Sequence, residues 1–234
     1  MGTVIIVRHG RTSANASGIL AGRTPGVLLD EVGREQARRT GERVAVVPVA
    51  AVVTSPLERC RETAAALLDR YDTAPELIVD DDLSECDYGE WQGRPLAELA
   101  ADPLWPTVQR QPSAVVFPGG ESMAFMQSRA VSAIRRRDAA LEAEHGPGVV
   151  WVAVSHGDII KSVLADALGL HLDLFQRIAV GPASVSIVRY GAERPEVVAT
   201  NTEAGDLAWL RSAGPAGDAP VGGGAGRPTA APAV

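Results

Sequence analysis

Two short runs of apolar residues, far apart in the chain, place the strongest limit on the folds that it can adopt. Val4–Val7 and Val149–Val154 are continuously apolar, without the alternation that a half-exposed strand shows. Runs of this length and composition are typical of strands that are buried on both faces of a sheet. Because helices must cover both faces of such a sheet, the chain is expected to form an α/β fold.

Other segments extend this alternation of strands and helices. Ala50–Val53 and Leu77–Val79 are short apolar runs that are expected to form further strands, and a terminal pair of strands is expected over 185–188 and 196–199. Strands that alternate with helices predict a three-layer α/β/α sandwich with a mostly parallel central sheet. Helices are expected over residues 30–46, 55–68, 121–145 and 158–168.

The C-terminal segment has a different composition from the rest of the chain. From Ala213 onward Ala, Gly and Pro dominate, and only Asp218 and Arg227 carry a charge. Such a segment cannot bury enough apolar surface to offset the entropy that is lost when it becomes ordered. We therefore expect one domain over residues 1–212, followed by a disordered tail over residues 213–234.

Composition argues against several classes of protein. The chain has 22 Lys and Arg against 29 Asp and Glu, a net charge of −7, whereas a nucleic-acid-binding protein needs a clustered basic face. No apolar run approaches the roughly 20 residues of a membrane span, and the N-terminal run is too short for a secretory signal. Cys60 and Cys86 form no CxxC pair, which favours a reducing compartment. These observations predict a soluble, cytoplasmic protein.

Basic and imidazole side chains follow three of the expected strands at the point where each strand ends. Arg8 and His9 follow the first strand, Arg59 lies one turn into the helix after the second, and His156 follows Val149–Val154. Because the carboxyl ends of parallel strands meet at one edge of a sheet, we expect these side chains to gather there. The following helices begin at the same edge, and their N-termini favour a multiply charged anion.

A metal site is a poorer interpretation of the same residues. His9 lies between Arg8 and Arg11, whose positive charges would repel a cation, and the chain contains no HExxH motif. A single histidine at a strand end is more often a hydrogen-bonded core residue than a catalyst. The prediction of an anion site without a metal therefore depends on the joint placement of these side chains.

Four motifs resemble those of the histidine phosphatase superfamily, whose members are also called phosphoglycerate-mutase-like. The run RHGRT at positions 8–12, with Asn15 after it, resembles the signature of the superfamily. The run SPLERCRET at 55–63 is similar to its second motif, and SHG at 155–157 to its third. The run LSECDYGEWQG at 83–93 resembles the acid-bearing loop of its phosphatase branch.

The resemblance covers residues 3 to about 190 and has consequences for fold and activity. Gly33, Gln36 and Ala37 also stand where the phosphatase branch usually has these residues. The resemblance implies a phosphoglycerate-mutase-like fold and a phosphatase that hydrolyses small phosphate monoesters through a phosphohistidine intermediate. It implies no cofactor and no metal, a small phosphorylated metabolite as substrate, and, because superfamily members are often dimers, a possible homodimer.

The resemblance also implies which residues catalyse the reaction. His9 would be the nucleophile, which must be neutral to attack, and the positive charges of Arg8 and Arg59 disfavour its protonated form. Glu85 would protonate the leaving oxygen and later accept a proton from the attacking water. Arg8, Arg59 and His156 would hold the equatorial oxygens of the phosphoryl group, where charge is spread in the transition state.

Three further residues would contribute to phosphate binding on the same grounds. The side chain of Asn15 and the backbone N–H of Gly157 would donate hydrogen bonds to the phosphoryl oxygens. Arg23 follows a glycine in the first long loop and would line the mouth of the pocket, although a surface arginine is an equally good interpretation of this position.

Two other functions stay open at this point. A phosphoglycerate-type phosphomutase would carry a longer segment after Glu85, with extra basic residues for the substrate carboxylate, whereas residues 95–121 are short and supply only Arg110. An enclosed site is what protects phosphohistidine from water, so the short segment favours hydrolysis. A non-catalytic phosphate-binding module would usually lack one of the catalytic residues, all of which are present here.

Overall fold

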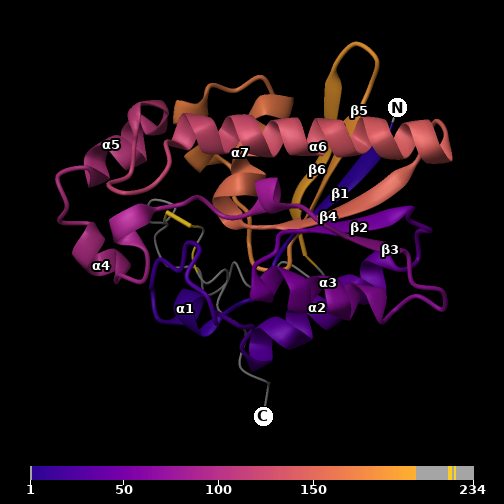
Figure 1. Ribbon diagram of the computed structural model, residues 1–234, viewed down its shortest axis with the longest axis horizontal. Helices are drawn as coiled ribbons and strands as arrows, with labels where there is room; N and C mark the ends of the chain where they lie inside the picture. Colours follow the sequence, from indigo (N-terminus) through magenta and orange to yellow (C-terminus); the bar gives the residue numbers. More distant parts are fainter. Residues whose placement is uncertain (1, 204–220, 223, 225–234) are drawn as a thin grey trace, which may run out of the picture.

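A six-stranded sheet lies at the centre of the molecule (Figure 1). The computed structural model describes residues 2–203, 221–222 and 224 of the chain. The strands follow each other across the sheet in the order β3-β2-β4-β1-β5-β6. Their bounds are β1 Thr3–Arg8, β2 Ala51–Thr54, β3 Glu76–Val79, β4 Val150–Ser155, β5 Val185–Tyr190 and β6 Pro195–Thr202.

Four neighbouring strands of the sheet run parallel. β1 pairs in parallel with β4, β4 with β2, and β2 with β3. β5 runs antiparallel to β1, and β6 runs antiparallel to β5 as a terminal hairpin. The prediction of a mostly parallel central sheet is therefore confirmed. The carboxyl ends of β1, β2 and β4 meet at one edge, which is where the functional side chains were expected.

Helices cover both faces of the sheet, which completes the three-layer sandwich (Figure 1). α2 (Glu31–Val44) and α3 (Glu58–Leu68) cover one face, and α6 (Met123–His145) and α7 (Gly157–Ala167) cover the other. Successive residues of β1 point to opposite faces, so Ile6 belongs to the apolar cluster under α6 and α7, and Val7 to the cluster under α2 and α3. Burial on both faces explains why the strand sequences are continuously apolar.

Short helices gather beyond the carboxyl ends of the parallel strands (Figure 1). Most of them come from the loop after β1 and from the long connection between β3 and α6, whereas one follows α7. The α-helices are α1 Ser13–Ala16, α4 Leu96–Leu99 and α5 Trp105–Arg110, and the 3-10 helices are Asp81–Leu83, Gly89–Trp91, Pro112–Ala114 and Leu172–Arg177.

The start of the helix after β2 differs from the expectation. Ser55 was expected to cap the helix, but α3 begins at Glu58 and Leu57 stands at its N-cap without a side-chain hydrogen bond. The hydroxyl of Ser55 instead accepts a hydrogen bond from the N–H of Leu57 at 3.3 Å and lies 2.8 Å from a ring nitrogen of His156. A tertiary contact therefore replaces the local cap.

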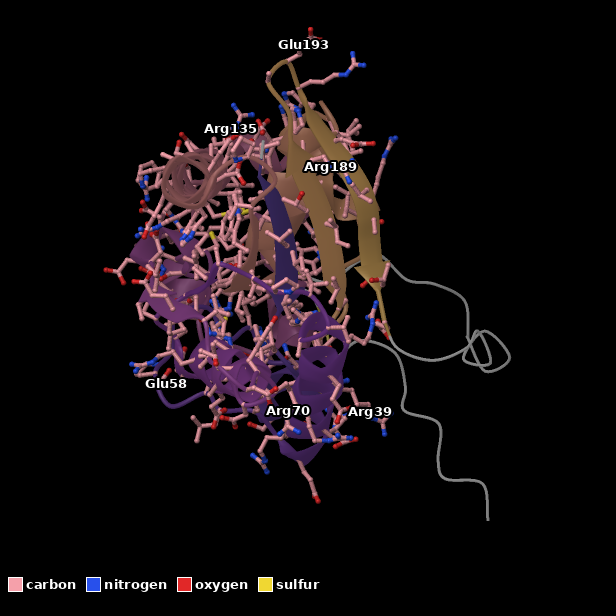
Figure 2. All side chains as sticks on the ribbon, turned by 90° about the vertical axis from the view of Figure 1, so that its right-hand side faces the viewer. Arg39, Glu58, Arg70, Arg135, Arg189 and Glu193 are labelled. Carbon is pink, nitrogen blue, oxygen red and sulfur yellow. The ribbon has the colours of Figure 1, made fainter. Side chains whose placement is uncertain are left out.

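The interior contains buried charges, whereas many other charged side chains lie at the periphery. Arg39, Arg135 and Glu193 are labelled at the outer surface in Figure 2, with Glu193 at the tip of the β5–β6 hairpin. Arg8 and Arg59, by contrast, are 1% and 2% exposed. Within the described part of the chain, no helix is both long enough and apolar enough to cross a membrane.

The expected disordered tail over residues 213–234 lies mostly outside the described residues. Three of its residues are described, namely Val221, Gly222 and Gly224. The side chain of Val221 is buried and belongs to the apolar cluster on the α6–α7 face of the sheet. At least this residue of the segment therefore packs against the domain.

Gly33 allows α2 to pack directly against the loop that follows β1. A Cβ atom at position 33 would lie 1.9 Å from the carbonyl oxygen of Arg11, a distance at which the backbone would have to move. One turn further along α2, the side-chain oxygen of Gln36 accepts a hydrogen bond from the N–H of Arg11 at 3.0 Å. Ala37 is fully buried. These contacts hold the loop that carries His9.

Replacement of Gly33 by Ala is therefore expected to destabilise the protein. Overpacking costs about 1–3 kcal/mol, and this cost outweighs the roughly 1 kcal/mol by which Ala exceeds Gly in helix propensity. Urea unfolding followed by circular dichroism would measure the difference. Arg61→Ala, at an exposed position of α3, is the control and should change stability by less than about 0.5 kcal/mol. An equally stable Gly33→Ala protein would contradict this packing.

Candidate active site

Two histidines and an arginine from different parts of the chain meet at the carboxyl edge of the sheet. His9 follows β1, Arg59 lies in the first turn of α3, and His156 follows β4 and caps α7. The ring centroids of His9 and His156 are 5.2 Å apart, and Nε of Arg59 donates to Nε2 of His9 at 3.4 Å. The structure thus brings together the side chains that the strand ends were expected to place in one site.

The hydrogen bonds of His9 define its tautomer. Nδ1 lies 2.7 Å from the carbonyl oxygen of Gly10, which can only accept, so Nδ1 carries the proton. Nε2 then holds a lone pair, in agreement with its position as acceptor from Arg59. Burial, followed by the positive charges of Arg59 and Arg8, holds the pKa of His9 well below its usual value of 6.5. His9 is therefore a neutral imidazole with a nucleophilic Nε2.

Two buried guanidinium groups provide the positive charge of the site. Nη1 of Arg8 donates to the carbonyl oxygen of Val180 at 2.9 Å, and Nη2 of Arg59 donates to that of Gly22 at 2.7 Å. Burial lowers the pKa of Arg8 to about 10, so its side chain stays charged at neutral pH. Nη1 of Arg59 is buried and has no acceptor among the described residues. A buried donor without a partner is costly, so this atom favours an anionic ligand.

His156 is held by side chains from the second motif. Its Nε2 lies 2.8 Å from the hydroxyl of Ser55 and 3.4 Å from the sulfur of Cys60. Burial and the positive charge of Arg59 lower the pKa of His156 well below 6.5. The ring is therefore neutral in the resting protein and could become charged only when an anion is bound beside it. Cys60 is fully buried, and burial raises the pKa of its thiol to about 12, so the thiol stays protonated.

Glu85 lies in the same cavity as His9 and Arg59. Its side chain is 3% exposed, and burial, followed by the negative charge of Asp158, raises its pKa to about 7. Its Oε1 accepts a hydrogen bond from the N–H of Cys86 at 2.9 Å. A carboxyl group with a pKa near 7 can both donate and accept a proton at neutral pH, as a general acid and base must.

Two arginines fix the backbone of the loop that carries Glu85. Nε of Arg23 and Nη2 of Arg129 donate to the carbonyl oxygen of Glu85 at 2.8 and 3.1 Å. Both arginines also form ion pairs with Glu121, at 3.0 and 2.6 Å. Arg23 was expected to line the mouth of the pocket, but it is not among the residues that line the cavity. Its guanidinium binds the Glu85 carbonyl and Glu121, and through these contacts it positions the loop that carries Glu85.

A tyrosine and an aspartate connect the acid loop to α7. The hydroxyl of Tyr88 donates to Oδ2 of Asp158 at 2.7 Å, and both side chains are fully buried. Lys161, one turn further along α7, lies 3.8 Å from Oδ1 of Asp158 and donates to Gln176 at 2.8 Å. The Glu85 loop and the helix after His156 are thus tied together by a buried hydrogen bond.

Asn15 belongs to the short helix α1, and Gly157 belongs to α7. Asn15 lines the cavity, and its Oδ1 accepts hydrogen bonds from the backbone N–H and hydroxyl of Thr12, which leaves its amide group as a donor. Gly157 is the first residue of α7, where the backbone N–H has no partner within the helix. Both positions suit hydrogen bonds to an anion.

Sequence reasoning missed several residues of this site. Ser55 was interpreted as a helix cap, and Tyr88 was not singled out within its motif. Asp158 and Lys161 had a visible signal, since both are charged residues in the otherwise apolar segment DIIKSVL of α7. Glu121 and Arg129 had none, because the loop around Glu85 that they bind is distant from them in the sequence. Over the described ranges, no group of three or more His, Cys, Asp or Glu side chains could hold a metal ion.

Comparison with known families identifies the class of protein. The model of the histidine phosphatase superfamily (branch 1) matches residues 4–203. The chain therefore belongs to this superfamily, as its four motifs predicted.

Individual relatives agree with this assignment. The bifunctional protein Rv2228c of Mycobacterium tuberculosis is 34% identical over 215 residues, which are 87% of this chain and 54% of that protein, so the chain spans about half the length of this relative. A 2,3-bisphosphoglycerate-dependent phosphoglycerate mutase 2 of Gloeobacter violaceus is 30% identical over 77% of this chain and 82% of its own. The structure of mycobacterial glucosyl-3-phosphoglycerate phosphatase Rv2419c with VO3 has a TM-score of 0.76 at 28% identity, covering 86% of this chain and 99% of that one.

The raised pKa of Glu85 predicts a pH dependence of stability. Its folded-state pKa of about 7 lies above the usual 4.5, so its contribution to stability is fully present below pH 4.5 and is lost as the pH rises through 7. Between pH 5 and pH 8 the free energy of unfolding of the wild type is expected to fall by roughly 1–3 kcal/mol relative to that of Glu85→Gln. Urea unfolding at both pH values would measure this difference.

Glu90→Gln is the matched control for this experiment. Glu90 is an exposed carboxylate in the same loop, so this variant should follow the pH dependence of the wild type. If Glu85→Gln and the wild type lost stability in parallel, Glu85 would not carry the perturbed titration.

Proposed function

We propose that this protein is a phosphatase that hydrolyses small phosphate monoesters through a phosphohistidine at His9. One observation carries the proposal. A neutral imidazole with a lone pair on Nε2 lies beside the Arg59 guanidinium, whose buried Nη1 has no acceptor among the described residues. A nucleophile and an unsatisfied cationic donor in one buried site are suited to a phosphoryl group.

In the first step His9 attacks the phosphorus atom of the monoester. The lone pair of Nε2 forms the P–N bond while the P–O bond to the leaving group breaks. Glu85 gives its proton to the leaving oxygen, and the alcohol departs. The proton on Nδ1 stays hydrogen-bonded to the Gly10 carbonyl, which stabilises the positive ring. Arg8, Arg59 and His156 hold the three equatorial oxygens, on which negative charge is spread in the transition state.

In the second step water hydrolyses the phosphohistidine. The carboxylate of Glu85 accepts a proton from the water while its oxygen attacks phosphorus, and the P–N bond breaks. The electron pair returns to Nε2 of His9, orthophosphate is released, and Glu85 is protonated again. A pKa of about 7 suits Glu85 for both steps at neutral pH.

Asn15 and Gly157 complete the proposed phosphate site as hydrogen-bond donors. Arg23 acts as a positioning residue, because its guanidinium binds the backbone carbonyl of Glu85. This assignment replaces direct contact between Arg23 and substrate. The mechanism requires neither a metal nor a cofactor, because the chain's own groups supply the nucleophile, the acid and the positive charge.

The described walls of the cavity favour a leaving group without a further negative charge. Beyond the catalytic groups they consist of Asn15, the loop 18–22 and Leu96, together with C-terminal residues. Arg59 is the basic side chain among these described lining residues. Arg110 in α5 is exposed and does not line the cavity. We therefore propose a small phosphorylated metabolite as substrate. A relative named glucosyl-3-phosphoglycerate phosphatase supports a small phosphorylated metabolite, but its name, which contains glycerate, does not support an uncharged leaving group.

The phosphomutase is the second candidate, and one relative is named as a phosphoglycerate mutase. A mutase must hold the carboxylate of phosphoglycerate, for which the described cavity supplies no second group of basic residues. The non-catalytic binding module is less favoured, because His9, Glu85 and His156 are all in place. A cytoplasmic location and a homodimer stay predictions from the sequence.

The two enzymatic candidates differ in the fate of the phosphoryl group. The purified protein should release orthophosphate from p-nitrophenyl phosphate and should not rapidly interconvert 3- and 2-phosphoglycerate in the presence of trace 2,3-bisphosphoglycerate. Phosphate release and NMR of the glycerate products would be measured together. Fast isomerisation with little free phosphate would establish the mutase, and no turnover of p-nitrophenyl phosphate between pH 4 and 8 would favour the binding module.

Replacement of His9 by Ala should abolish turnover, because the proposed mechanism forms the P–N bond with the lone pair on Nε2 of His9. It should also abolish the acid-labile, base-stable label that a ³²P-labelled substrate leaves on the wild type after rapid quenching in base. His145→Ala, which removes a partly exposed imidazole at the end of α6, should retain both activity and label. A labelled His9→Ala protein would show that another residue is the nucleophile.

A further inference from the structure

Residues from the C-terminal segment lie inside the candidate active site. Val221, Gly222 and Gly224 line the same cavity as His9 and Arg59, although they are more than 150 positions away in the sequence. The mechanism proposed above makes no use of them. We call these three residues the C-terminal strap.

Polar contacts hold the strap on both sides of the site. The N–H of Gly222 donates to Oδ2 of the buried Asp158 at 3.0 Å. The carbonyl oxygens of Gly222 and Gly224 accept hydrogen bonds from Nη2 of Arg8 at 3.5 and 3.1 Å. The Val221 side chain is 2% exposed and packs in the main core cluster. The strap is thus bound by a carboxylate, a guanidinium and an apolar pocket.

The backbone conformation of the strap requires glycine at position 222. Its φ is +73°, a region that residues with a side chain rarely adopt. A Cβ atom there would also lie 2.8 Å from Cδ1 of the buried Leu20. The close approach of this backbone to Arg8 and Asp158 therefore depends on the missing side chain.

The strap contacts Nη2 of Arg8, an atom that the proposed site needs for binding phosphate. Nη2 of Arg8 is directed at strap carbonyls, whereas substrate binding would direct the Arg8 guanidinium at phosphoryl oxygens. The cavity that remains has a volume of about 20 Å³. A water molecule needs roughly 10–15 Å³ on this scale, so a phosphoryl group does not fit beside the strap. Substrate and strap exclude each other.

We propose that the C-terminal strap is an autoinhibitory element that competes with the phosphate group for Arg8. This inference rests on the proposed function only in so far as the site binds phosphate. Carbonyl oxygens are neutral acceptors, whereas a phosphate dianion forms an ion pair with the Arg8 guanidinium and can accept two parallel hydrogen bonds from it, so it can displace the strap. Only molecules with a displaced strap bind phosphate. The apparent dissociation constant is therefore the intrinsic dissociation constant divided by the fraction of molecules whose strap is displaced.

A glycine substitution in the strap tests this competition. Gly222→Val places a β-branched residue at the positive φ and against Leu20, so it should release the strap. Its dissociation constant for orthophosphate, measured by isothermal titration calorimetry, is expected to be about 3- to 10-fold lower than that of the wild type. For p-nitrophenyl phosphate, KM should fall by a similar factor while kcat is unchanged.

Gly148→Val is the matched control, since it makes the same change at a positive φ of +85°, where an added Cβ meets no atom within 4 Å, just before the amino end of β4. It should leave the phosphate affinity unchanged. Equal or weaker phosphate binding by Gly222→Val would overturn the proposal. Calorimetry requires no turnover, so an inactive protein that binds phosphate would refute the proposed reaction and still test the strap. Failure of all three proteins to bind orthophosphate would overturn the phosphate site and the strap together.

Hydrogen exchange in the intact wild type provides a second measurement. The amide of Gly222 is protected by its hydrogen bond to Asp158, and saturating orthophosphate should remove this protection. Exchange of the peptide that contains residues 221–224 should therefore become faster when orthophosphate is added, as measured by mass spectrometry. Slower or unchanged exchange would show that the segment closes over the bound anion or is independent of it, and either result would overturn competition.

Discussion

Burial of the Arg8 and Arg59 guanidinium groups beside His9 is the constraint on which the rest of the site depends. Two positive charges in the interior are costly unless acceptors surround them, and the carbonyls of Val180 and Gly22 supply part of what they need. The same charges keep the His9 imidazole neutral, because a third positive charge beside them is unfavourable. Nη1 of Arg59 has no acceptor in the part of the chain that the structure describes, so the site favours an anionic ligand.

Buried carboxyl groups oppose these charges from the other side of the site. Asp158 pairs with Lys161 and Tyr88, and its negative charge helps to raise the pKa of Glu85 to about 7. Arg23 hydrogen-bonds the backbone of Glu85 and so holds the acid in place. Nucleophile and acid therefore have opposite pKa shifts from their ordinary values, and both shifts arise first from burial. One low-dielectric cavity thus prepares an imidazole that stays neutral and a carboxyl group that can give and take a proton at neutral pH.

Much of this arrangement could be predicted from local patterns. The continuous apolar runs indicated strands covered on both faces, and Asp30 was correctly placed at the start of α2, where its side chain accepts from the N–H of Gly33. The start of α3 was wrong because the Ser55 hydroxyl is near His156, a partner about 100 positions away. Arg23 was placed at the pocket mouth because a sequence does not show which way a long side chain turns. Asp158 was overlooked because its partner Tyr88 lies in another motif.

The sequence by itself determined the order of strands and helices, the sheet edge at which the motifs end, and the residue types available there. These features follow from short-range periodicity and from motifs of a few residues. Only the tertiary structure decided which nitrogen of His9 carries the proton, how far the pKa of Glu85 is raised, and that Gly222 lies against Arg8 and Asp158. Each of these depends on contacts between segments distant in the chain, whose energies are set by burial and by distances of a few ångströms.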